Sequence, residues 1–173
     1  SAMIPGVMAQ SGMESAEMVE GIVAKIKPDV VIAIDALAAG SSKRLNSTIQ
    51  LADTGINPGS GIGNRRKGLN KETIGVPVIA IGIPTVIHAA TIVRDTMEQM
   101  LNVLSELPNI KGNAGFETLK AFDDNEKMNL IMELMDEKLV NMFVTPKDID
   151  ESIQFMAEIV AYSINLLFSL SRR

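Results

Sequence analysis

An apolar run that ends on one carboxylate is the first feature of this chain that could take part in a reaction. Residues 30–39 read Val-Val-Ile-Ala-Ile-Asp-Ala-Leu-Ala-Ala, and the run before Asp35 is rich in β-branched side chains. Such a run predicts a strand buried on both faces of a parallel sheet. Because open α/β sheets react at the carboxyl ends of their strands, Asp35 is a candidate catalytic group. The alternative is that Asp35 caps the segment that follows.

A second carboxylate belongs to a tripeptide with a known use. Asp53-Thr54-Gly55 is the motif that pepsin-like proteases use for each catalytic aspartate. Those enzymes have an all-β frame, whereas this chain has an α/β pattern. We therefore expect Asp53 and Gly55 to serve the geometry of a turn. The glycine-rich residues 55–68 that begin there predict a long loop, which binds a phosphate, covers a substrate or contacts another subunit.

The single histidine follows a second apolar run, residues 76–83, near the expected start of a helix. Parallel neighbours end at the same edge of a sheet, so Thr85 and His88 are expected near Asp35. Two roles stay open for His88: a solvated or structurally hydrogen-bonded side chain, or a group that tunes Asp35 electrostatically. Ser41 and Ser42 have no evident base in the sequence, which argues against a serine triad.

The amino-acid composition excludes several kinds of catalytic and binding site. The 173 residues include no Cys and one His, which excludes thiolate nucleophiles, disulfides and multi-histidine metal centres. The net charge of −5 argues against general binding to nucleic-acid phosphates. No apolar run approaches the ~20 residues of a membrane span, and no cleavable signal is evident. We expect an intracellular protein that binds neither nucleic acid nor membrane.

The order of the expected elements indicates an α/β fold with a mainly parallel sheet. Residues 1–3 resemble an expression scar, and residues 4–173 read as the C-terminal portion of a single α/β domain. We expect strands at 29–34, 46–52 and 76–83, and a loop followed by a helix within 11–27. Further helices are expected at 88–104, 126–140 and 145–170, with a polar connection at 105–125.

Ordered motifs along almost the whole chain resemble the spore germination protease family. They are residues 5–8, 12–14, 32–39, 48–50, 53–56, 58–61, 63–64, 76–86 and 144–147. The resemblance implies a three-layer α/β fold, a sheet flanked by helices, similar to the hydrogenase maturation endopeptidases.

The same resemblance implies an endopeptidase that degrades small acid-soluble spore proteins during spore germination. It would be made as a zymogen, act by an atypical aspartic mechanism without a cofactor, and form a homo-oligomer in the cytoplasm of the spore core. Two aspartates are implicated in the family, and Asp35 stands at the second. The first lies upstream, on a glycine-rich strand and loop that these 173 residues do not contain. We therefore expect this chain by itself to be inactive.

Two departures from the family pattern affect the expected site. Family members usually carry Asp where this chain has His88, and several carry His where it has Asn57. In the maturation endopeptidases a loop histidine helps to bind metal, and Asn57 is a poorer ligand, so we expect no metal here. The alternative is a metal-dependent processing endopeptidase that uses Asp35 as a ligand. The residues expected to line the site around Asp35 are Asp53, Thr54, Gly55, Thr85 and His88.

Overall fold

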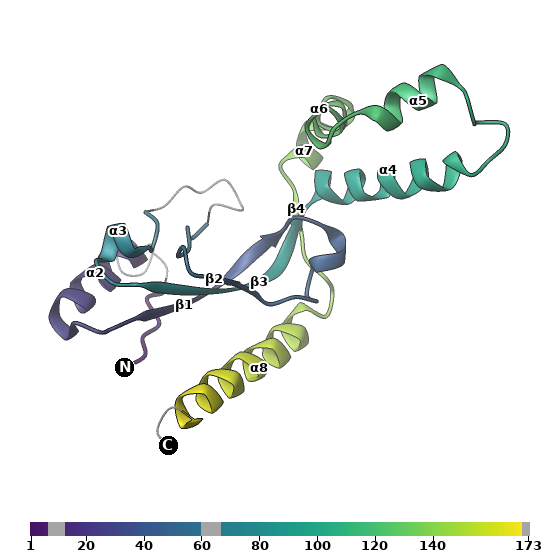
Figure 1. The fold of residues 1–173 in the computed structure, drawn as a ribbon. Helices are drawn as coiled ribbons and strands as arrows, with labels where there is room; N and C mark the ends of the chain where they lie inside the picture. Colours follow the sequence, from purple (N-terminus) through teal and green to yellow (C-terminus); the bar gives the residue numbers. More distant parts are fainter. Residues whose placement is uncertain (7–12, 60–66, 171–173) are drawn as a thin grey trace. The chain divides into compact units, whose positions relative to one another are not determined.

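The structure is a computed structural model that describes residues 1–6, 13–59 and 67–170. It has a mixed α/β architecture with a four-stranded open sheet (Figure 1). The strands are β1 (Val31–Ala39), β2 (Gln50–Ala52), β3 (Val78–His88) and β4 (Phe143–Val144). The helices are α2 (Ser15–Ile26), α3 (Lys71–Ile74), α4 (Ala89–Ser105), α5 (Ala114–Ala121), α6 (Asp124–Leu134), α7 (Glu137–Val140) and α8 (Ile149–Leu170), with a short 3-10 helix, η1 (Ser42–Arg44).

The sheet has the order β1-β3-β2, and β4 pairs with the end of β3. The Val31 amide donates to the Pro77 carbonyl at 2.9 Å, and further along both strands Leu37 lies against Gly82, so β1 and β3 begin side by side and run in the same direction. β2 and β4 are both antiparallel to β3. The expected mainly parallel sheet is therefore wrong. Residues 40–49, between β1 and β2, contain only η1, and no crossover helix returns the chain to the starting edge.

Both long strands extend beyond their predicted ends. β1 continues four residues past Asp35 to the buried Ala39, and β3 continues to His88. The prediction that Asp35 stands at the carboxyl end of its strand is wrong, and so is the alternative that it caps the next segment. The cause is the sequence after Asp35, where Ala-Leu-Ala-Ala can continue a half-buried strand as readily as the run before it.

The helices after the sheet differ from the prediction in two places. The expected polar connection 105–125 contains α5, where the Asn113 side chain accepts from the Phe116 amide at 3.1 Å. The expected helix 126–140 is divided into α6 and α7, because the chain is extended at Met135 and Asp136 caps the second helix. The helices predicted within 11–27, at 88–104 and at the C-terminal end are confirmed as α2, α4 and α8, and residues 11–12 lie outside the described residues.

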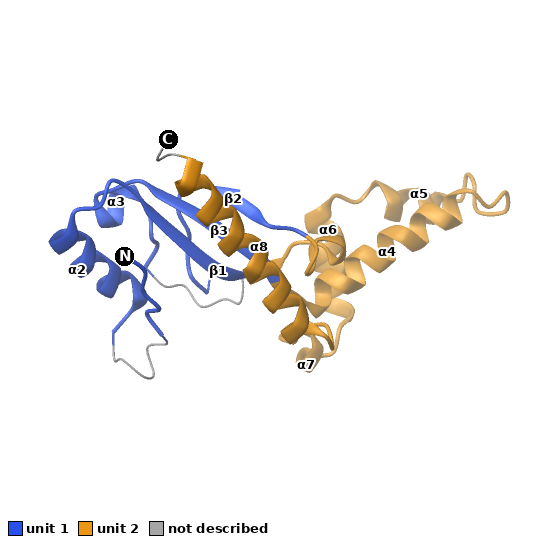
Figure 2. Cartoon of the chain, turned by 90° about the horizontal axis from the view of Figure 1, so that it is seen from below, with its two compact units in different colours: residues 1–37, 48–84 blue, residues 38–47, 85–173 orange. Residues whose placement is uncertain are grey.

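The chain divides into two compact units (Figure 2). Unit 1 comprises residues 1–37 and 48–84, and unit 2 comprises residues 38–47 and 85–173. In unit 1, α2 and α3 pack together, and their apolar side chains form a core with the first part of β3. The members of this core are Ala16, Val23, Leu69, Ile74 and Val78. The treatment of residues 4–173 as one domain stays a prediction.

Unit 2 is organised around α4, which packs against α6 and α7. Leu101 on α4 and Ile131 on α6 are buried, and Lys127 pairs with Glu98 at 3.4 Å. The Ala89 amide at the start of α4 donates to the Met142 carbonyl at 2.9 Å. These contacts fix the first turns of α4 beside β4.

The last helix, α8, is the most exposed apolar element among the described residues. It has 22 residues, and Val160 is its one buried side chain. By length and composition alone it is apolar enough to cross a membrane, contrary to the sequence-based expectation that no segment has that length. Helices of soluble proteins can pass the same test of length and composition.

Candidate functional site

Asp35 lies in unit 1, on the face of β1 that packs against the core. The residue is half-buried, and its Oδ1 accepts a hydrogen bond from the Ala36 amide at 2.9 Å. Alternate residues of a strand share a face, so Asp35 follows Val31 and Ala33, which pack against the core of unit 1. The next residue on that face, Leu37, lies against Gly82 of β3. Asp35 is thus the one carboxylate in an otherwise apolar row.

The Asp53-Thr54-Gly55 tripeptide also lies in unit 1, directly after β2. Asp53 and Thr54 are exposed, and Thr54 forms a β-bridge with Val78. Gly55 has φ = +86°, and a Cβ there would lie 2.8 Å from Asn70 Cα. The positive φ and the crowding explain why glycine stands at position 55, and the turn role expected for Asp53 stays a prediction. Among the described residues, no hydrogen bond or ion pair joins Asp35 to any member of this tripeptide.

Thr85 and His88 lie in unit 2, at the end of β3. Thr85 is buried, and its carbonyl accepts from the Thr145 hydroxyl at 2.9 Å. His88 is the last residue of β3 and the N-cap residue of α4. Its ring meets Phe143 edge-on, with 5.0 Å between ring centroids and 74° between the ring planes. The described contact of His88 is therefore with an aromatic ring of β4.

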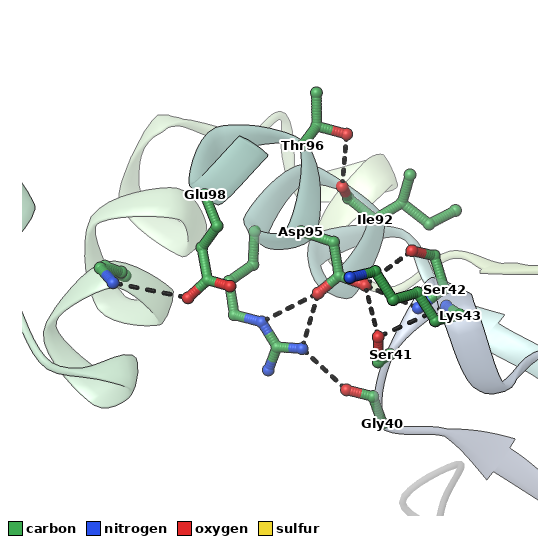
Figure 3. Close-up of polar contacts among 10 residues, drawn as sticks. Gly40, Ser41, Ser42, Lys43, Ile92, Asp95, Thr96 and Glu98 are labelled. Atoms are coloured by element: carbon green, nitrogen blue, oxygen red, sulfur yellow. Dashed lines mark hydrogen bonds and ion pairs between the residues drawn. The ribbon is translucent and has the colours of Figure 1, made fainter. Parts of the chain in front are cut away.

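A polar cluster that the sequence did not reveal is centred on Asp95 of α4, in unit 2 (Figure 3). Asp95 Oδ2 accepts from the Ser42 amide at 2.6 Å, the Ser42 hydroxyl at 2.8 Å and the Ser41 hydroxyl at 3.1 Å. Asp95 Oδ1 accepts from Arg94 Nη2 at 2.8 Å, and the same Nη2 donates to the Gly40 carbonyl at 2.7 Å. The cluster ties the segment after β1 to the first turns of α4.

The hydrogen bonds of this cluster favour the ionised form of the Asp95 carboxyl group. Partial burial alone would raise the pKa of Asp95, but the hydrogen bonds from the Ser42 amide, Arg94 and the two serine hydroxyls lower it to about 2. A carboxylate with so low a pKa is a weak base near neutral pH. Ser41 and Ser42 therefore donate to Asp95 as structural hydrogen-bond donors.

A small polar hollow of about 120 Å³ adjoins the cluster. Its lining residues are Ser41, Lys43, Asp95, Glu98, Gln99 and Asn102. One signal in the sequence could have pointed to Asp95: aspartate is a poor helix former, and it stands inside the expected helix 88–104. Its serine partners, more than 50 residues earlier, left no such signal.

The part of the chain that the structure describes offers few side chains placed to bind a metal ion. Residues 1–6, 13–59 and 67–170 contain no group of three His, Cys, Asp or Glu side chains placed to hold an ion. Most of the basic part of the glycine-rich loop lies outside these residues, including Arg65 and Arg66. Lys67 is described: Nζ pairs with Glu20 Oε2 at 2.6 Å, and this hydrogen bond raises the pKa of Lys67.

The sequence as a whole matches one family of known proteins. A family model described as "Germination protease" matches residues 1–110. A germination protease of Caldanaerobacter subterraneus subsp. tengcongensis is 46% identical over 166 residues, which cover 96% of this chain and 51% of that protein. Those of Clostridium acetobutylicum and Bacillus velezensis are 45% and 42% identical, over 95% of this chain and 50% and 53% of their own lengths. The chain thus spans about half the length of these curated relatives.

Proposed function

Because the chain belongs to the germination protease family, we propose that it forms part of an endopeptidase that degrades small acid-soluble spore proteins during spore germination. The observation that carries this proposal is the similarity to germination proteases over 95–96% of the chain. The finer parts of the proposal, namely mechanism, substrate and assembly, rest on the motifs quoted above and on the surroundings of Asp35.

The proposed mechanism is of the aspartic type. Two carboxylates that share one proton activate a water molecule against the peptide carbonyl, because like charges held close together cannot both ionise. Asp35 supplies one of them. In support, Asp35 is a half-buried carboxylate in an otherwise apolar row of β1. The second carboxylate is the upstream aspartate that the family resemblance implies, which is not among these 173 residues.

It follows that the 173-residue polypeptide by itself does not turn over substrate. The test is to incubate it with a small acid-soluble spore protein and to follow fragments by mass spectrometry. We expect no specific cleavage, since one carboxylate cannot serve as both acid and base in this mechanism. Specific cleavage that survives stringent purification would contradict this part of the proposal and leave the family membership untouched.

The role of Asp35 is tested in a full-length germination protease that carries this sequence. Asp35→Asn is nearly isosteric, so it should preserve the fold while lowering the rate at least ~100-fold. The matched control is Asp29→Asn, which changes an exposed aspartate outside the expected site and should leave the rate close to that of the unsubstituted protein. Near-normal turnover by a folded Asp35→Asn protein would remove Asp35 from the mechanism.

The remaining parts of the proposal follow the family resemblance. They are synthesis as a zymogen, a homo-oligomer in the cytoplasm of the spore core, no direct contact with nucleic acid or membrane, and a three-layer fold related to the hydrogenase maturation endopeptidases. The rival is a metal-dependent processing endopeptidase with Asp35 as a ligand. Inhibition of the full-length protein by a chelator, reversed by added metal, would favour the rival.

A further inference from the structure

Gly82, in the middle of β3, stands where a side chain has no room. A Cβ there would overlap Leu37 Cδ1 of β1 and lie 2.7 Å from Leu37 Cγ. The backbone at position 82 is that of a strand, so its φ does not itself demand glycine. Glycine in a strand interior often marks a site where another group approaches closely. The missing side chain therefore serves the close approach of Leu37.

The residue of β1 beside Gly82 is Asp35. In a parallel pair an amide donates to the carbonyl of the residue before its partner, so the bond from Val31 to Pro77 places Val31 level with the residue after Pro77. Four residues further along both strands, Asp35 is level with Gly82. The contact between Leu37 and Gly82 agrees with this register, because Leu37 follows Asp35 on the same face of β1.

Leu37 and Gly82 provide the packing of β1 at the level of Asp35. Leu37 is half-buried and Gly82 is buried, and both belong to unit 1. On the other face of β1, Ile34 and Ala36 are exposed, so within unit 1 the packing here comes from the face of Asp35. A methyl group at position 82 would meet Leu37 Cγ as well as Cδ1, so a turn of the terminal methyl groups would not relieve the contact. Either the whole Leu37 side chain or β1 itself would have to shift.

We propose that Gly82 is a positioning residue for Asp35. Its missing side chain lets Leu37 pack on β3, and this contact holds the Asp35 carboxylate in one place relative to the sheet. The inference rests on the proposed aspartic mechanism and deepens it, because it names what fixes the reacting carboxylate. Two carboxylates that share a proton must be held close together, and misplacement of a reacting group by about 1 Å can lower a rate ~100-fold.

The test measures kcat and KM of a full-length germination protease that carries this sequence, with a small acid-soluble spore protein as substrate. Gly82→Ala should lower kcat at least ~10-fold and change KM less than ~2-fold, because the misplaced carboxylate acts in the transition state and not in substrate binding. The matched control is Gly40→Ala, which adds the same methyl group where nothing lies within 4 Å and should leave both constants unchanged.

Leu37→Ala tests whether the loss acts through Leu37, because it removes the three atoms nearest to the new methyl group. In that background Gly82→Ala should change kcat less than ~2-fold, so the two substitutions are far from additive. Urea titration of each variant checks that it is folded in the assay, so that kcat reports the placement of Asp35 and not the amount of folded enzyme.

A second pair of variants covers the case in which Gly82→Ala does not fold. Leu37→Ala alone removes the contact without crowding, and it should lower kcat at least ~5-fold with KM nearly unchanged. Leu51→Ala makes the same change at an exposed position of β2, in the same unit, and should change kcat less than ~2-fold. Equal effects of these two substitutions on kcat would overturn the proposal.

Asp35→Asn in the same assay separates failure of this inference from failure of the proposed function. If Asp35→Asn keeps a near-normal kcat, the proposed mechanism is wrong and Gly82 has no catalytic group to position. If Asp35→Asn loses activity while a folded Gly82→Ala protein keeps a normal kcat, the mechanism stands and the positioning role is overturned. A loss that Gly40→Ala reproduces, that appears in KM alone, or that Leu37→Ala does not relieve would overturn the positioning role as well.

Discussion

Asp95 accepts two hydrogen bonds from Ser42, one from the backbone amide at 2.6 Å and one from the hydroxyl at 2.8 Å. The two residues are 53 positions apart in the sequence, so this pair fixes the segment after β1 to the second turn of α4. The Asp95 side chain is only 11% exposed, which limits replacement of these bonds by water. The pair therefore holds two distant segments of unit 2 together and stabilises their packing.

We expect Asp95→Asn to destabilise the chain by about 2 kcal/mol, because it removes a charged acceptor and directs an NH2 group at donors. The measurement is the free energy of unfolding from urea titration. The control is Asp29→Asn, an exposed aspartate, which should change the free energy by less than about 0.5 kcal/mol. Equal effects of the two substitutions on the free energy of unfolding would contradict the stabilising role of Asp95.

The same carboxylate predicts a pH dependence. Its pKa in the folded chain is about 2, below the ordinary value of 3.8, so the folded state favours the charged form. The stabilisation is fully present above the unfolded value and is lost as pH falls from 3.8 through about 2. The difference in unfolding free energy between wild type and Asp95→Asn should therefore shrink over that interval. A difference that stays constant or grows on acidification would contradict the assignment.

The edge-on contact between His88 and Phe143 predicts a coupling between β3 and β4. A double-mutant cycle with His88→Ala, Phe143→Leu and the double variant should give a coupling of about 0.5–1.5 kcal/mol in the free energy of unfolding. The backbone register of the two residues supports this expectation, since His88 is paired with Phe143 in the sheet. Additive effects of the two single substitutions would show that the rings do not stabilise one another.

The elements with a strong periodic pattern were predictable from the sequence, and those decided by distant contacts were not. The apolar periodicity of α2, α4 and α8 and the apolar run of β3 predicted their type. The direction of β2 was not predictable, because it depends on pairing with residues 80–82, about 30 positions away. The end of β1 was not predictable from the position of Asp35, because a strand face can include one half-buried carboxylate.

The candidate site was predictable only where its chemistry is local. The apolar run around Asp35 made it a candidate, which stays a prediction, and the positive φ of Gly55 fits the backbone geometry expected at that position. The Asp95 cluster was missed because its donors, Ser41 and Ser42, belong to a different segment. A serine hydroxyl that donates to a carboxylate leaves no pattern in the sequence, since the partner is chosen by the fold.

Gly55 gives a prediction that separates turn geometry from chemistry in the Asp53-Thr54-Gly55 tripeptide. Its φ of +86° disfavours other residues, and a Cβ would meet the Leu69 carbonyl, which accepts from the Ile56 amide at 2.9 Å. Gly55→Ala should therefore destabilise the chain by about 1–3 kcal/mol. The matched control is Gly21→Ala in α2, where nothing lies within 4 Å of the added methyl group and helix propensity predicts a gain of about 0.5–1 kcal/mol. Urea titration measures both, and opposite signs are expected. If Gly55→Ala is as well tolerated as Gly21→Ala, the tripeptide is not held by turn geometry and a chemical role for it must be considered again.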